Sequence, residues 1–203
     1  MRRMLHLLAV FIVSVVLFET IIYVTSTPRP QPEFFELYAL GENGTATDYY
    51  PNGTSYLPLG RPVRWYLQLT DHTGSVQLVA ILVKLGNRTI NAPNDTRSLP
   101  SPAPLVTEFS RFVQDNETWE TPFIWQIMNI SATGDLIRIL ELQINNETYY
   151  VNSSAENGLD FRAIFELWTW NTDLVNFEYG WWAGNEHRVA WLQLWFNATI
   201  PSP

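Results

Sequence analysis

Cysteine is absent from this 203-residue chain, so disulfides, thiolate metal sites and cysteine nucleophiles are excluded together. Lysine is nearly absent as well, because Lys84 is the only one. Beyond the first 25 residues, ten basic side chains stand against nineteen acidic ones. A net charge of that sign repels phosphate backbones, so nucleic acid is excluded as a partner. The lack of cysteine does not place the chain in the cytoplasm, since a core of this size needs no disulfide.

Motifs of catalysis are also missing. The sequence contains no phosphate loop, dinucleotide fingerprint or serine-nucleophile elbow. The histidines show no metal-ligand spacing (His6, His72 and His187). Paired carboxylates for sugar hydrolysis would have to come from Glu166, Glu178 or Glu186, and nothing in the sequence fixes their separation. We therefore expect no enzyme activity, no cofactor and no metal.

The first 25 residues predict a membrane anchor. Met4 to Val24 is a run of 21 residues interrupted only by His6, Ser14, Glu19 and Thr20. A helix of about 20 apolar residues crosses the roughly 30 Å hydrocarbon layer. Arg2 and Arg3 precede it and indicate a cytoplasmic N-terminus, with everything after residue 25 outside the plasma membrane. The alternative is a cleaved signal peptide with Leu7 to Phe18 as its apolar core.

Glu19 is the unusual residue of this helix, because a carboxyl group within the membrane is costly. It can extend toward the interface or stay protonated. Alternatively, it contacts a polar group of a neighbouring transmembrane subunit. We take the second reading as a hypothesis.

N-glycosylation sequons are the strongest signal in the chain. Serine and threonine make up about 14% of the residues, so fifteen asparagines should give about two sequons by chance. Nine are present, none with proline in the middle position: Asn43, Asn52, Asn87, Asn94, Asn116, Asn129, Asn146, Asn152 and Asn197. The excess indicates an extracytoplasmic surface that carries N-linked glycans. A contact face should then be poor in sequons, because glycans exclude large partners.

The exposed part is predicted to be all-β. Residues 26–33 form a Pro-rich spacer, and residues 34–203 form the domain. Apolar and polar residues alternate from Pro62 to Thr70, which predicts a half-buried strand, whereas Val76 to Leu85 is apolar almost throughout and predicts a strand covered on both faces. Six further strands are expected at Phe34–Leu40, Phe123–Met128, Leu136–Ile144, Thr148–Val151, Phe161–Trp170 and Val189–Asn197.

Eight short strands separated by turns predict a β-sandwich. Asp71 to Ser75 is expected to be a hairpin-like turn, and Gly86 to Pro104 a surface loop. Pro104 to Val113 places Leu105, Phe109 and Phe112 at helical spacing, which permits a short helix. Residues 161–171 and 187–197 have a similar arrangement of aromatic residues, which the pairing of two strands would explain.

The tryptophans provide the remaining signal. Trp65, Trp125 and Trp191 fall within predicted strands and are expected in the core. Trp181 and Trp182 lie between glycines in a stretch without a sequon, so we expect them on a loop. There they would contact a partner subunit, the membrane interface or a sugar. The alternative is a loop folded over the end of the sandwich.

The chain resembles the extracytoplasmic module of archaeal DUF1616 proteins. The resemblance rests on Phe35 to Gly41, Gly44, Asp48 to Pro51, Leu59-Gly60, a strand ending at Asp71-His72, and the closing stretch Arg188 to Asn197. It implies an immunoglobulin-like β-sandwich outside the membrane, and no catalytic residues, because the family has no established activity. Family members usually place several transmembrane helices before the module. The single predicted helix here suggests a stand-alone subunit.

These observations predict a membrane-anchored glycoprotein that acts by contact. Its partners would be membrane lipid and either an integral-membrane protein or copies of itself. The first hypothesis is an accessory or structural subunit of an archaeal membrane or cell-surface complex. The alternative is a carbohydrate-binding module that uses the aromatic loop. Self-assembly into a filament is disfavoured, since an anchor would tether each copy.

Overall fold

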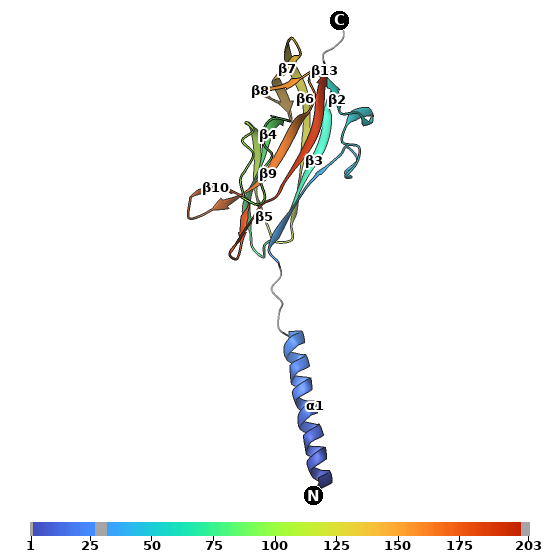
Figure 1. Cartoon of the computed structure of the whole chain (residues 1–203), viewed down its shortest axis with the longest axis vertical. Helices are drawn as coiled ribbons and strands as arrows, with labels where there is room; N and C mark the ends of the chain where they lie inside the picture. Colours follow the sequence, from blue (N-terminus) through green and yellow to red (C-terminus); the bar gives the residue numbers. More distant parts are fainter. Residues whose placement is uncertain (1, 27–31, 200–203) are drawn as a thin grey trace. The chain divides into compact units, whose positions relative to one another are not determined.

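The computed structural model describes residues 2–26 and 32–199, without the side chains of residues 2, 3, 5 and 7–10. The chain divides into two units, Met1–Pro32 and Glu33–Pro203. The first contains helix α1 (Arg2–Ser26), and the second contains the strands (Figure 1). Most of the predicted spacer, residues 27–31, lies outside the described residues.

Helix α1 presents apolar side chains on all sides. Phe11, Leu17 and Ile21 are each at least 58% exposed. The hydroxyl of Thr20 donates to the Val16 carbonyl at 2.7 Å, so this polar side chain is satisfied within the helix. Within residues 2–26 and 32–199, no helix combines the length and the hydrophobicity of a membrane span. The predicted transmembrane assignment therefore gains no support from this part of the chain.

The regular secondary structure of the second unit is almost entirely β-strand. A short 3-10 helix, η1 (Pro51–Gly53), precedes the second of them. The strands are β1 (Phe34–Leu40), β2 (Tyr56–Pro58), β3 (Val63–His72), β4 (Gln77–Asn87), β5 (Leu105–Val113), β6 (Thr118–Thr133), β7 (Leu136–Ile144), β8 (Glu147–Glu156), β9 (Phe161–Asn171), β10 (Asn176–Tyr179), β11 (Trp181–Ala183), β12 (Glu186–Arg188) and β13 (Trp191–Thr199).

Two sheets form a sandwich, as the sequence predicted. The first has the order β1-β3-β6-β7-β8, and the second has the order β2-β13-β9-β4-β5, with β10 paired to the end of β9. Strands β11 and β12 form a separate hairpin. The predicted pairing of the two aromatic stretches is confirmed, because β13 pairs antiparallel with β9 and places Trp191 opposite Glu166.

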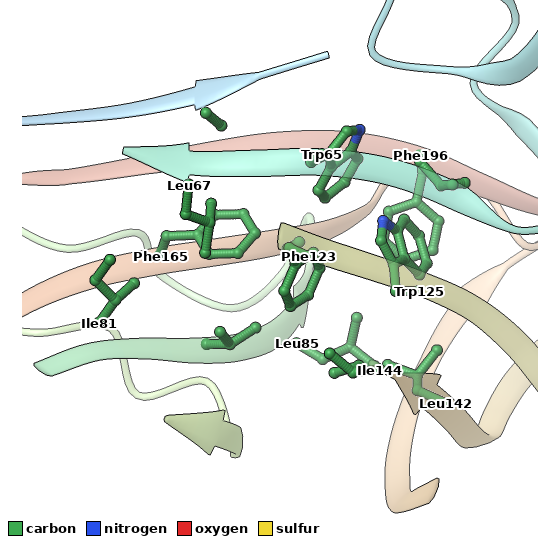
Figure 2. Close-up of a cluster of buried hydrophobic side chains, with 14 of the residues drawn as sticks. Trp65, Leu67, Ile81, Leu85, Phe123, Trp125, Leu142, Ile144, Phe165 and Phe196 are labelled. Atoms are coloured by element: carbon green, nitrogen blue, oxygen red, sulfur yellow. The ribbon is translucent and has the colours of Figure 1, made fainter. Parts of the chain in front are cut away.

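The core lies between the two sheets (Figure 2). Val63, Trp65, Leu67 and Leu69 of β3 are all fully buried, which confirms the alternating pattern predicted for this strand. Around Trp65 gather several aromatic rings, with centroids 5.1 to 6.1 Å from its own (Tyr50, Phe123, Trp125 and Phe165). Of the tryptophans predicted in the core, Trp65 and Trp125 are there, whereas Trp191 lies on the outer face of the second sheet.

The helix predicted for Pro104 to Val113 is wrong. These residues form β5, which pairs with β4 along its length. Phe109 packs edge-on against Phe123, while Phe112 on the opposite face is 65% exposed. The open edge of β4 and the β-branched residues of this segment favour a strand over the helical spacing.

The turn predicted between the third and fourth strands is also not a hairpin. Strand β3 belongs to the first sheet and β4 to the second, so residues 73–76 carry the chain across the sandwich. The turn is held by Asp71, whose Oδ1 accepts the Thr73 amide at 2.7 Å, and by Asp115, which accepts the Gly74 amide at 2.9 Å. Gly74 has a positive φ of 78°, which glycine adopts at little cost.

Strand β4 is covered on both faces, as predicted, because residues 88–104 lie over its outer side. We call this segment the strap. Beneath it, Lys84 Nζ lies 2.8 Å from Glu166 Oε2, and the Glu166 side chain is fully buried. The strap is fastened to this pair, since Ser101 donates its amide to Glu166 and accepts from Lys84 through its carbonyl, both at 2.7 Å. The predicted surface loop is confirmed for residues 88–104, most of which are exposed or partly exposed, while Ser101 and Ala103 are buried where the strap is fastened.

Asp71→Asn tests the electrostatics of the turn. Burial raises the pKa of the Asp71 carboxyl, and Asp115 adds to this, while the hydrogen bonds from Thr73 and the charge of His72 oppose it. A raised pKa in the folded state favours folding below the unfolded pKa of about 3.9, and this contribution is lost as the pH rises through the folded value. Asparagine keeps the acceptor for Thr73 without the charge.

The variant should therefore melt at a higher temperature than the parent at pH 7, and the difference should vanish near pH 3. Thermal unfolding at both pH values checks this. A difference in melting temperature that stays constant with pH would contradict the assignment.

Candidate functional site

A groove of about 310 Å³ opens at one end of the sandwich, where the chain enters β1. We call it the tryptophan groove. Strand β1, the turn between β3 and β4, strand β9 and strands β10 and β11 contribute its walls: Glu33, Phe35, Thr73, Ser75, Gln77, Thr169, Trp170, Asn171, Thr172, Glu178, Trp181 and Trp182. None of these residues is a sequon asparagine.

A glycine positions the groove's tryptophans. Gly180 joins β10 to β11 with a positive φ of 81°, and a Cβ atom there would lie 2.0 Å from the Arg188 carbonyl oxygen. Its amide donates to the Leu167 carbonyl at 2.9 Å, and its carbonyl accepts from Thr169 Oγ1 at 2.6 Å. The bend is thus fixed on both sides to β9, and it directs β11 across the end of the sandwich.

Trp181 and Trp182 occupy a strand rather than the predicted loop, and they face opposite sides. Trp181 is 8% exposed and packs edge-on against Phe35 with ring centroids 5.2 Å apart. Trp182 is 55% exposed. The burial of Trp181 agrees with the alternative of a segment folded over the end of the sandwich. Trp182 is the ring that a ligand can reach. The contact role of both residues stays a prediction.

Glu178 organises the polar side of the groove. Its Oε2 accepts from Asn171 Nδ2 at 2.7 Å and from Trp182 Nε1 at 3.3 Å. Its Oε1 lies 3.8 Å from His187 Nε2, and the His187 ring meets Trp182 edge-on with centroids 4.9 Å apart. Four side chains from β9 to β12 thus hold one another in place, which fixes the orientation of the exposed indole.

The lining also includes Trp170 and small polar groups. Trp170 is braced by Phe177, with centroids 5.4 Å apart and the rings nearly perpendicular. At the start of β4, Gln77 Nε2 donates to Oγ of Ser75, in the preceding turn, at 2.8 Å. The groove therefore offers flat aromatic surface beside amides, hydroxyls and one carboxylate. Such a lining recognises a ligand that is polar at its edges and apolar on its faces.

Sequence reasoning identified only part of this groove. The sequence indicated Trp182 by its position in a run between glycines. It indicated Glu178 only as one of three possible carboxylates for sugar hydrolysis. Trp170 and Asn171 were not recognised, because they reach the groove through the pairing of β9 with β10. The polar turn of residues 171–176 between two aromatic runs is the signal that predicts this hairpin.

Seven sequon asparagines are exposed: Asn43, Asn52, Asn94, Asn116, Asn129, Asn146 and Asn152. The other two are half-buried and act in the fold. Asn87 Nδ2 donates to the Ser154 carbonyl at 2.6 Å, and Asn197 Oδ1 accepts the Asp160 amide at 2.9 Å. No sequon begins between residues 153 and 196. Strands β9 to β12, which supply much of the groove, therefore lie in the longest sequon-free stretch of the domain.

Asn87 is expected to be unmodified in protein from the native host, whereas the exposed sequons should carry glycans. The reason is that Asn87 Nδ2, the atom to be modified, is already bonded and half-buried. Asn94 in the strap is the matched control, since it uses only its Oδ1, which accepts the Arg97 amide at 2.9 Å. Mass spectrometry of intact glycopeptides measures both. Full occupancy of Asn87 would show that the glycan is added before this contact forms.

The remaining candidates are not among the residues that line the groove. Glu19 is exposed on α1, and its role as a partner contact stays a prediction. His72 Nδ1 lies 2.9 Å from Asn116 Oδ1 and its ring stacks on Phe34, so it has a structural place. Among the described residues, no group of three or more acidic, histidine or cysteine side chains could hold a metal ion. Glu186 is exposed and pairs with Arg188 at 2.9 Å, whereas Glu166 is buried and pairs with Lys84.

No protein-family model matches the sequence, and no curated protein matches it. Among solved structures, the chain is similar to β-glucosidase from Listeria innocua, in complexes with glucose and with gluconolactone, at TM-scores of 0.34 and 0.35 and 11% identity. The similarity covers 83% of this chain and 16% of the enzyme. The sporulation control protein Spo0M from Bacillus subtilis is similar over 79% of this chain and 90% of its own, at a TM-score of 0.26 and 11% identity.

Proposed function

We propose that this chain is an extracytoplasmic glycoprotein that works by contact, as an accessory or structural subunit of an archaeal membrane or cell-surface complex. The observation that carries the proposal is the tryptophan groove, a preformed and sequon-free concave site with an exposed indole. Preformed concave sites with a few fixed polar groups are the usual form of binding sites in proteins. No sequon asparagine lines the groove. Asn116 lies beside it, since its Oδ1 is 2.9 Å from Nδ1 of His72, the residue before the turn that lines the groove, so a glycan there would border the site.

The location belongs to the proposal as well. Its basis is the sequence of Met4 to Val24, which has the length of a membrane span, and the excess of sequons after it. The N-terminus would be cytoplasmic and the sandwich outside the plasma membrane. An immunoglobulin-like topology and kinship with the DUF1616 module are part of the same proposal, supported by the two-sheet architecture and the motifs of the opening and closing strands.

Glu178 is placed to bind a ligand. Its carboxylate accepts hydrogen bonds from Asn171 and Trp182, which hold it in one position. A fixed acceptor beside an exposed ring orients a ligand. The partner would be an integral-membrane protein or further copies of this chain, with membrane lipid around α1.

Extraction of native membranes tests the proposal. Carbonate washing should leave the chain in the membrane fraction, and release by the wash would overturn the anchor. After mild detergent extraction, capture of the chain and mass spectrometry should find a companion protein in stoichiometric amount. Trp182→Ala should lose it, whereas Tyr150→Ala, which changes a side chain that is 84% exposed on β8, should retain it.

Glu19→Leu provides a second variant for the membrane contact. If the companion is held within the membrane through Glu19, this substitution should lower its yield, while leaving the folded domain unchanged. A chain that came away alone in every case would contradict the accessory-subunit function.

A further inference from the structure

We propose that the tryptophan groove binds a pyranose ring, and that glycans carried by other copies of this chain are its ligands. The inference rests on the proposed function only in taking the same groove as the contact site. It names the chemistry of the ligand, which a contact function leaves open.

The exposed indole is preset for stacking. The Trp182 ring is braced from one side by His187, and its Nε1 is tied to Glu178, so its free face keeps one orientation. A pyranose ring has a face lined with C–H groups, which are apolar and weakly positive. Such a face packs on the negative face of an aromatic ring, and the larger indole is the best platform. A ring that is already immobile loses little entropy when the ligand binds.

The polar groups suit the hydroxyl groups of a sugar. Each hydroxyl both donates and accepts, so it is best met by amides and carboxylates placed side by side. Glu178 supplies an acceptor, Asn171 and Gln77 supply amide groups, and Ser75 supplies a hydroxyl. These side chains are linked in pairs, Asn171 to Glu178 at 2.7 Å and Gln77 to Ser75 at 2.8 Å. Their positions are therefore fixed before a ligand arrives.

Size and composition favour a sugar over a protein anchor. The groove volume of about 310 Å³ lies at the lower end of the roughly 300–1,000 Å³ of small-molecule sites. The centre of a protein interface is depleted in polar groups and filled by apolar anchors. Here the lining includes Thr73, Ser75 and Gln77 as well. A terminal sugar of a glycan has the size and the polarity that this lining accepts.

The same chain carries candidate ligands. Seven sequon asparagines are exposed, and none of them lines the groove. A glycan on one copy and the groove of another are different surfaces, so their contact is heterologous and does not close on itself. Copies anchored in one membrane would thus associate through their glycans. The chemistry of the ligand is a pyranose, and its source is either a copy of this chain or another envelope glycan.

Fluorescence titration of the full chain in detergent tests the site. The probes are the methyl glycosides of glucose, mannose and galactose, and glycopeptides released from the native protein by protease. Binding of at least one probe should be saturable. Trp182→Ala should weaken it by about tenfold or more, the ratio that 1.4 kcal/mol of lost stacking corresponds to. Trp182→Phe should retain part of the affinity, and Tyr150→Ala should bind like the parent.

Two preparations distinguish the sources. Glycosylated protein from the native host should self-associate in sedimentation experiments and dissociate when the bound glycoside is added. Protein made without glycosylation should bind the same glycoside and stay monomeric. Glycoside binding without self-association by either preparation would overturn the assignment to copies of the chain and support another envelope glycan.

Failure of the inference can be told from failure of the proposed function. If no probe binds to a folded chain, but a companion protein still depends on Trp182, the groove is a protein contact and the inference is wrong. If neither the probes nor a companion bind, the contact function itself is overturned.

Discussion

Lys84→Met is expected to lower the free energy of unfolding by about 3–5 kcal/mol, because it leaves a buried charge without its partner. The Glu166 carboxylate is fully buried and lies 2.8 Å from Lys84 Nζ. Its other neighbours, the Ser101 amide and the Trp168 indole at 3.1 Å, donate hydrogen bonds but carry no charge. Denaturant titration of parent and variant, followed by tryptophan fluorescence, measures the difference.

The double variant Lys84→Met/Glu166→Gln separates charge from packing. Glutamine keeps an acceptor for Ser101 and Trp168 but removes the unpaired charge, so most of the lost stability should return. Such a recovery would be a coupling between the two sites, as expected for residues in direct contact. If the single variant costs less than about 1 kcal/mol, water reaches the carboxylate and the strap does not seal the pair.

Trp65→Ala should destabilise the domain by about 3–5 kcal/mol, the usual cost of truncating a buried tryptophan. Trp65 is fully buried at the centre of the core, where four aromatic rings surround it. Its Nε1 also donates to the Tyr49 carbonyl at 2.5 Å, so the loop before β2 loses a fixing point as well. Thermal and denaturant unfolding of the variant measure the cost.

Trp195→Ala is the comparison for this prediction. Trp195 lies on the outer face of β13, is 38% exposed and stacks over the Arg162 guanidinium at 5.1 Å. Its truncation removes surface packing without opening a cavity in the core, so it should cost clearly less than Trp65→Ala. Equal losses for the two variants would contradict the central place of Trp65.

The strands could be predicted from the sequence where one face is buried. In β3 the pattern of period two is unbroken, because every second side chain enters the core and the others reach the outer face. The prediction failed for β5. There Phe109 packs inward, but Leu105 and Phe112 are more than half exposed, so the apolar residues of the segment do not all lie on one buried face. The sequence also did not indicate to which sheet each strand belongs. The turn residues after β3 are compatible both with a return to the same sheet and with a crossing to the other sheet.

The candidate site was predictable only in part for a related reason. Adjacent residues of a strand point to opposite sides, so once Trp181 packs on Phe35, Trp182 points away from it. Because residues 181 and 182 were predicted to lie on a loop, the difference in exposure between the two tryptophans was not predicted. The remaining walls come from residues as distant as Glu33 and Ser75, and only the tertiary fold brings them to one place. The sequons, in contrast, needed no fold, because each is complete within three residues.

The position of Glu33 has a mechanical consequence. Its backbone carbonyl accepts from Arg188 Nη1 at 3.1 Å and from Trp181 Nε1 at 3.5 Å, so the first residue of the domain is tied to the hairpin that bears the exposed indole. A ligand held in the groove and a tether attached before Glu33 would pull on the same end of the sandwich. Tension between them would pass through this short bridge and leave the aromatic core and the other strands unloaded. Such an attachment would yield first at the groove, by release of the ligand, rather than by unravelling of the sheets.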